Sequence, residues 1–204
     1  MINFIKFSIH FLPFLTLTES VKNLAEQKLR SQILDTSKYS SDLEPPAQIT
    51  EITICFKLLG IAGINDGEGK FNLQFELIQK WRDSRLSWKT CDNNIKSLKL
   101  KPTDVWLPQL VLGNAAHGDF SINQARFLNV NHDGIVDYRP GKIATTSCEL
   151  DVDKFPLDTQ TCAVKILPLF YSTDYVKFKF ENPEYSLCES NEGAMNRRDY
   201  RVFL

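Results

Sequence analysis

The spacing of apolar residues changes along the chain, and the change separates an N-terminal helix from a series of strands. Apolar residues first recur every four positions, at Val21, Ala25, Leu29 and Ile33. That spacing predicts one apolar stripe on an α-helix. Ser20 precedes the stripe and is a suitable N-cap, because its hydroxyl can accept a hydrogen bond from a free backbone amide. Pro45 and Pro46 cannot continue a helix and favour an extended chain.

Beyond these prolines the period falls to two, which is typical of strands with one buried face. Ile52, Ile54, Phe56 and Leu58 alternate with polar residues, and so do Phe71, Leu73, Phe75 and Leu77. Asn65 to Gly69 and Asn131 to Gly134 contain Asp-Gly steps that predict tight turns. We therefore expect a mainly β fold, with an N-terminal helix followed by an antiparallel β-sandwich.

The first residues have the layout of a secretory signal peptide. Lys6 precedes an apolar run from Phe7 to Leu17, and small residues follow. We interpret residues 1–19 as a signal peptide and 20–204 as one domain; a short buried helix is the alternative for the first segment. No later stretch reaches the roughly 18 apolar residues that a membrane helix needs, so we expect no anchor in the mature chain.

Charge and composition exclude several classes of function. The chain has 24 Lys and Arg against 25 Asp and Glu, a net charge of -1, and this balance gives no reason to expect a nucleic-acid partner. No His/Cys cluster has metal-ligand spacing, and we expect no cofactor. Neither a nucleophile elbow nor a phosphate loop occurs, and His117 and His132 lie near turns, so we expect no enzyme.

Export would allow disulfides to persist, and the chain has five cysteines, which is an odd number. Cys55 lies in the middle of a predicted strand and could simply be a buried thiol, and the sequence does not decide its pairing. Cys91 and Cys188 could pair with each other, stay free or join another chain.

The segment from Cys148 to Cys162 has a distinctive composition, because thirteen residues separate the cysteines and include Phe155, Pro156 and Asp158. Its acidic residues are solvated turn formers or, less simply, a calcium site. The spacing and the aromatic-Pro-x-Asp centre resemble the signature loop of the Cys-loop pentameric ligand-gated ion channels and of the soluble acetylcholine-binding proteins. The resemblance implies a disulfide between Cys148 and Cys162.

Other landmarks of that family follow in order. The stretch 81–88 resembles its Trp-x-Asp-x-x-Leu-x-Trp pattern, and 105–115 resembles its Trp-x-Pro-Asp segment with Gln109 in place of Asp. Large aromatic residues dominate protein cores, so we interpret Trp81, Trp88 and Trp106 first as packing residues.

In the family, ligand binds between subunits in a cage of aromatic side chains. Aligned on that cage, the ligand-interface positions here are Glu76, Gly113, Asp137, Arg139, Leu169 and Tyr171. Three aromatic walls are missing, so we expect acetylcholine to bind poorly between identical copies. A shift in alignment would let Phe170 or Tyr171 replace one wall. Arg139 could bind a zwitterion or an anion, or the charges could be a solvated rim.

The resemblance also implies how binding would be passed to a channel. Phe155, Pro156 and Asp158, with the turn at 65–69, would contact a membrane domain that this chain does not contain. The family's binding loop C and last strand would follow Leu204, so we expect the C-terminal strand to be missing. The leading interpretation is the extracellular ligand-binding domain of a pentameric channel subunit at the plasma membrane. Its partners would be other subunits and a small neurotransmitter-like ligand. A secreted binding protein and a non-binding accessory subunit are the alternatives.

Overall fold

The computed structural model describes residues 14–41, 44–65, 67–91, 94–116, 118, 120–122, 125–150 and 160–180. It contains one α-helix, nine strands and two short 3-10 helices within those ranges. In chain order they are α1 (Phe14–Ile33), β1 (Thr50–Asn65), β2 (Lys70–Arg82), η1 (Ser84–Leu86), β3 (Ser97–Leu100), η2 (Pro102–Asp104), β4 (Leu110–Leu112), β5 (Leu128–Asn131), β6 (Ile135–Tyr138), β7 (Gly141–Ser147), β8 (Ile166–Pro168) and β9 (Val176–Phe180).

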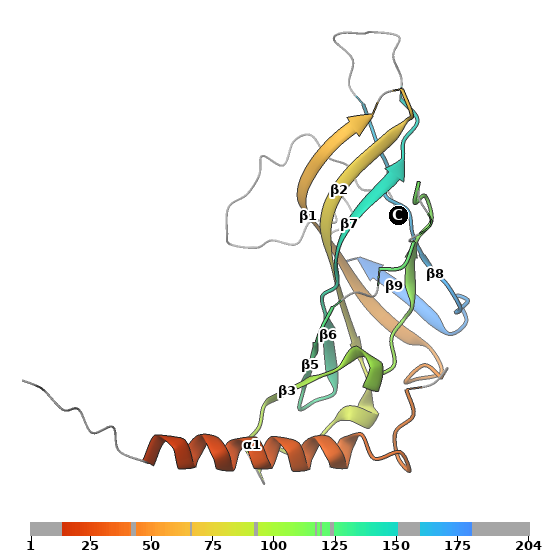
Figure 1. The fold of residues 1–204 in the computed structure, drawn as a ribbon. Coiled ribbons are helices and arrows are strands. Elements are labelled where there is room, and N and C mark those ends of the chain that lie inside the picture. The colour runs from red at the N-terminus through yellow and green to blue at the C-terminus, as the bar shows by residue number, and fades with distance from the viewer. Residues whose placement is uncertain are drawn as a thin grey trace, which may run out of the picture.

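The helix lies across one end of the main sheet, next to β3 (Figure 1). Leu29 and Ile33 are buried, as the apolar stripe predicts, and Arg30 donates from Nη2 to the carbonyl of Lys99 at 3.0 Å. The N-cap prediction at Ser20 is wrong, because α1 already begins at Phe14. The sequence has no glycine or proline between Phe14 and Ser20, so nothing there interrupts the helix. The signal peptide at 1–19 stays a prediction.

The β1–β2 hairpin forms the longest strand pair of the main sheet. The two strands pair antiparallel from Ile52 opposite Trp81 to Asn65 opposite Lys70. The other edge of β2 is shared, since β7 pairs with its first half and β6 with its second half. The sheet order is β3-β5-β6-β2-β1-β9, with β7 also on β2 (Figure 1).

One pairing departs from the antiparallel expectation. β9 runs parallel to β1, with Thr50 opposite Val176, whereas the other strand pairs in the described residues are antiparallel. A separate two-stranded sheet joins β4 to β8. It is linked to β7 by the segment after β4, where the amide of Ala116 donates to the carbonyl of Thr145 at 2.8 Å. The predicted mainly β sandwich with an N-terminal helix is confirmed.

Aromatic residues fill the space between the layers. Phe56 and Phe75 stack with ring centroids 4.9 Å apart. Trp81 and Trp106 are almost fully buried and meet edge to face at 5.9 Å, which confirms both as core residues. Trp88 is partly buried against the core and donates from Nε1 to the carbonyl of Ile95 at 2.7 Å.

The cysteines follow the prediction in part. Cys148 and Cys162 form a disulfide, as the resemblance implied. Cys55 is disulfide-bonded, so it is not the buried thiol that its strand position allowed. A buried position inside a strand had suggested simple packing, but it is equally compatible with a bridge. Cys91 is a free, exposed thiol.

Candidate functional site

The β4–β8 ladder places two of the predicted ligand-interface residues at its two ends. Leu112 lies opposite Ile166 and Leu110 opposite Pro168, so Gly113 and Leu169 are at opposite ends of this short ladder. The amide of Gly113 donates to the carbonyl of Lys165 at 2.8 Å, and the amide of Leu169 donates to the carbonyl of Gln109 at 3.0 Å. Backbone hydrogen bonds therefore fix both positions.

The β4 side chains of this ladder are buried, whereas Leu167 on β8 and the residues that follow β8 are apolar and exposed. A Cβ atom on Gly113 would lie 2.6 Å from Cδ1 of Leu167, so a larger residue would displace that side chain. Leu167 is 50% exposed, Leu169 is 45% exposed and Phe170 is 70% exposed. We call Gly113, Leu167, Leu169 and Phe170 the apolar surface.

Tyr171 differs from its neighbour Phe170, because its hydroxyl bonds into the core. The indole Nε1 of Trp106 donates to the Tyr171 hydroxyl at 2.9 Å, and the two ring centroids are 5.5 Å apart. Tyr171 is partly buried against the hydrophobic core. Of the two residues that could replace a missing wall, Phe170 is therefore the accessible one.

A buried polar network reaches the Tyr171 hydroxyl through Trp106. The backbone amide of Trp106 donates to the Tyr39 hydroxyl at 2.9 Å, and that hydroxyl donates to Oδ2 of Asp83 at 3.2 Å. Arg85 donates from Nε and Nη2 to the two carboxylate oxygens of Asp83, each at 2.9 Å. Asp83 is fully buried, and the Arg85 guanidinium lies 4.7 Å from the Tyr39 ring centroid.

Burial and this network also shift the acid-base behaviour of the group. Burial is the main cause that raises the pKa of Tyr39 above its usual range. The hydrogen bonds to Asp83 are the main cause that raises the pKa of Arg85. The sequence landmark contained Asp83, but it gave no signal for Tyr39, which comes from the segment after α1.

The other predicted ligand-interface residues lie on the outer face of the main sheet. Glu76 is half-buried between buried Phe75 and Leu77, and Asp137 and Arg139 flank buried Tyr138. Their alternation with core residues confirms that they point away from the core. We call Glu76, Asp137 and Arg139 the charged surface.

Arg139 already has a carboxylate partner. Its Nε and Nη2 donate to the two oxygens of Asp137, each at 2.8 Å. These hydrogen bonds are the main cause that raises the pKa of Arg139, and the charge of Glu76 adds to it. An anionic ligand that used the Nε–Nη2 edge of the guanidinium would have to displace Asp137.

Other predicted features can be placed only in part. The proposed coupling residues Phe155, Pro156 and Asp158 lie outside the described residues, whereas most of the 65–69 turn is described and closes β1–β2. In the part of the chain that the structure describes, no group of three or more His, Cys, Asp or Glu could hold a metal ion. Within those same ranges no helix is long and apolar enough to cross a membrane.

Comparisons with known proteins give one consistent family. Residues 26–202 match the model of the neurotransmitter-gated ion-channel ligand binding domain. Neuronal acetylcholine receptor subunit alpha-4 of Mustela putorius furo is 30% identical over 93% of this chain and 32% of its own length. Acetylcholine receptor subunit delta of Mus musculus is 31% identical over 78% of this chain and 31% of its own. Neuronal acetylcholine receptor subunit beta-2 of Rattus norvegicus is 27% identical over 79% and 33%. The chain thus spans about a third of the length of these relatives.

Proposed function

The chain belongs to the neurotransmitter-gated ion-channel ligand binding domain family, and on that premise we propose that it is the extracellular ligand-binding domain of a pentameric channel subunit. The relatives are receptor subunits, so the family is one of ligand-gated receptors and not of enzymes. The Cys148–Cys162 disulfide suits a secretory route to the outer face of the plasma membrane.

The proposed ligand site lies between subunits. The apolar surface of one subunit would face the charged surface of the next. The observation that carries this proposal is the direction of Glu76, Asp137 and Arg139, which alternate with core residues and so point away from the sandwich interior. The simplest way for these outward-pointing side chains to share a site with Gly113 and Leu169 is for the two surfaces to meet at a contact between two chains.

The proposed site would bind quaternary amines poorly. A cation cage needs aromatic faces, but Gly113, Leu169 and Glu76 stand at three aligned positions. Tyr171 bonds to Trp106, and Arg139 bonds to Asp137. Because Arg139 already bonds to Asp137, we interpret these charged side chains as a solvated rim of the site rather than as an anion-binding group.

Ligand binding would reach the channel through the disulfide-closed loop. Phe155, Pro156 and Asp158 would contact the membrane domain together with the turn at 65–69. A ligand that binds two states of the subunit contact differently would shift the population toward the open channel.

Paired cysteines test the subunit contact. Two chains, each with Cys91→Ser to remove the free thiol, would be expressed together, one with Leu169→Cys and the other with Glu76→Cys. We expect a disulfide-linked product of two chains on a non-reducing gel, and none when either variant is expressed alone. If the co-expressed variants stay monomeric, neighbouring copies do not meet through these surfaces.

An accessory role is the second candidate, and the non-aromatic residues Gly113, Leu169 and Glu76 at the aligned aromatic positions favour it. Such a subunit would assemble with others and bind no ligand at its own apolar surface. A linked assembly that gains no thermal stability from any amine or amino acid would favour this role, whereas a secreted binding protein would gain stability from its ligand.

A further inference from the structure

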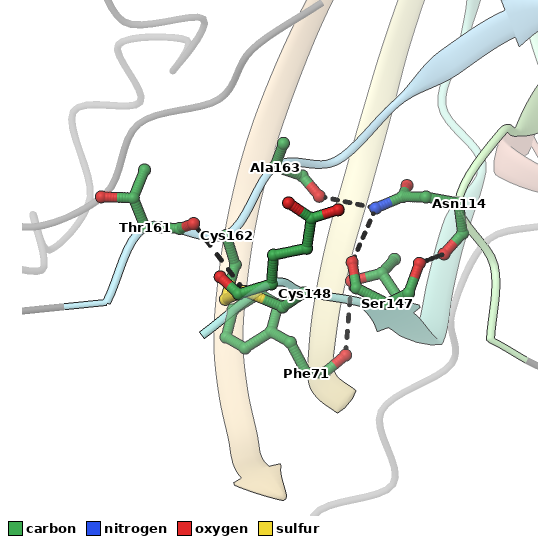
Figure 2. Close-up of a disulfide and its surroundings, with 9 residues drawn as sticks. Phe71, Asn114, Ser147, Cys148, Thr161, Cys162 and Ala163 are labelled. Atoms are coloured by element: carbon green, nitrogen blue, oxygen red, sulfur yellow. Dashed lines mark hydrogen bonds between the residues drawn. A yellow bond between two sulfur atoms is a disulfide. The ribbon is translucent and has the colours of Figure 1, made fainter. Parts of the chain in front are cut away.

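Asn114 directly follows Gly113, and its side chain reaches the two segments that enter and leave the disulfide (Figure 2). Its Nδ2 donates to the carbonyl of Ser147 at 3.1 Å and to the carbonyl of Ala163 at 2.8 Å. Its Oδ1 accepts from the amide of Lys165 at 3.0 Å. One side chain therefore holds the residue before Cys148 and the residue after Cys162.

This arrangement requires the chemistry of an amide. Asparagine offers two N–H donors and one carbonyl acceptor on a short stem. Those groups match two backbone carbonyls and one backbone amide that lie on different segments. An aspartate could serve the amide of Lys165, but it could not donate to either carbonyl while ionised.

Backbone hydrogen bonds extend the link in both directions. On one side, the amide of Gly113 donates to the carbonyl of Lys165 at 2.8 Å. On the other side, the amide of Ser147 donates to the carbonyl of Asn114 at 2.9 Å. The amide of Cys148 then donates to the carbonyl of Gly69 at 2.8 Å.

The last contact connects the disulfide to the end of the β1–β2 hairpin. A Cβ atom on Gly69 would lie 2.9 Å from the carbonyl oxygen of Cys148, so the two backbones approach closely. Gly69 also has a φ of +58°, which favours glycine. The hydrogen bonds thus run without a gap from the apolar surface to the hairpin turn.

We propose that Asn114 is a positioning residue that holds both arms of the disulfide loop in register with Gly113 and, through Cys148, with the turn at Gly69. A displacement at Gly113 would then move the loop and the turn together. This functional consequence rests on the proposed ligand site, whereas the positioning itself does not.

Asn114→Asp tests the donor role of Nδ2 separately from the acceptor role of Oδ1. The carboxylate keeps an acceptor for Lys165 but sets a negative oxygen against the carbonyls of Ser147 and Ala163. Asn72→Asp is the matched control, because Oδ1 of Asn72 accepts from the Thr145 hydroxyl at 2.7 Å and a carboxylate can keep that bond. Both variants add the same charge.

Hydrogen exchange and disulfide reduction give local measurements. Because two hydrogen bonds to the backbone are lost, we expect the Ser147 and Cys148 amides of Asn114→Asp to exchange about tenfold faster or more. Cys148 is 7% exposed and Cys162 is half-buried, so a reducing thiol reaches the Cys148 sulfur only through local opening. Reduction of the disulfide should accelerate, while the amides that pair β1 with β2 keep their protection.

Three results would overturn the proposal: unchanged exchange at Ser147 and Cys148, an equal effect in Asn72→Asp, or a loss of protection spread evenly over β1 and β2. Asn114→Ala removes the same donor without adding charge and should give the same local pattern if the aspartate variant folds poorly. The measurement uses no ligand, so its failure leaves the subunit contact standing, and a failed cysteine crosslink leaves the role of Asn114 standing.

Discussion

The apolar surface and the charged surface are proposed as the two sides of one ligand site, but their side chains are held in place differently. Gly113 and Leu169 are fixed by backbone hydrogen bonds at the two ends of the β4–β8 ladder, and Tyr171, next to Phe170, reaches the buried network through Trp106. Asp137 lies on β6, which is paired on both sides, but its carboxylate bonds to Arg139, whose side chain is 51% exposed. The difference teaches that side-chain bonds beside the apolar surface reach the core, whereas the Asp137–Arg139 ion pair lies at the surface and can be lost at little cost.

The buried Asp83–Arg85 ion pair and the exposed Asp137–Arg139 ion pair should differ most in their effect on stability. Asp83 is fully buried, so Asp83→Ala leaves Arg85 and the Tyr39 hydroxyl without their partner. We expect the free energy of unfolding to fall by about 3–5 kcal/mol. Asp137→Ala is the matched control and should cost at most about 1 kcal/mol. Urea denaturation followed by tryptophan fluorescence measures both, and equal losses would contradict the comparison.

Restoring aromatic walls tests the surfaces as halves of one site. Leu169→Trp and Glu76→Trp together should strengthen binding of a choline ester, because each ring adds about 0.5–2 kcal/mol, or roughly two- to thirtyfold. Calorimetry on the assembled chain measures the change. Leu24→Trp is the control, since Leu24 is 67% exposed on α1. If the control strengthens binding as much, the aromatic positions have no special role.

Loss of the hydrogen bond between Trp106 and Tyr171 should have a moderate effect on stability. Tyr171→Phe removes the acceptor for Nε1 of Trp106, and Trp106 is 1% exposed. A buried donor without a partner costs about 1–3 kcal/mol, so the melting temperature should fall. Tyr175→Phe should leave it unchanged, because Tyr175 is 55% exposed. A neutral Tyr171→Phe would show that this hydrogen bond contributes nothing to stability.

The inner side of β2, behind the charged surface, should give the smallest effect and the opposite sign. Gln79 is fully buried, and among the residues that the structure describes neither polar atom of its side chain has a hydrogen-bond partner. Gln79→Met keeps a similar volume and removes this penalty, so we expect a gain of about 1 kcal/mol in urea denaturation. The exposed Gln74→Met on the same strand should be neutral. A loss at Gln79 would mean that the amide is satisfied in solution.

The sequence predicted the elements well where the apolar period was long and regular. The β1 and β2 strands, their connecting turn and the disulfide all lie where the pattern and the resemblance predicted. The start of α1 was wrong because an apolar leader and an apolar helix have the same local composition. The parallel partner of β1 was also missed, since alternation gives the face of a strand but not its neighbour.

Pairing between side chains was the main limit at the candidate site. Alternation predicted that Arg139 points outward, but it could not tell that Asp137 occupies both ends of its fork. The aligned position of Tyr171 predicted a ligand contact, whereas its hydroxyl accepts from Trp106. Tyr39 and Asn114 gave no signal, because their partners lie far away along the chain.

The central claim is that two unlike surfaces of neighbouring subunits form a ligand site without a cation cage. The most direct measurement is a titration of the assembled wild-type chain with acetylcholine in a calorimeter. The account predicts no saturable heat at millimolar ligand. Saturable binding at micromolar concentrations would contradict it, because that affinity requires aromatic walls that the apolar surface lacks.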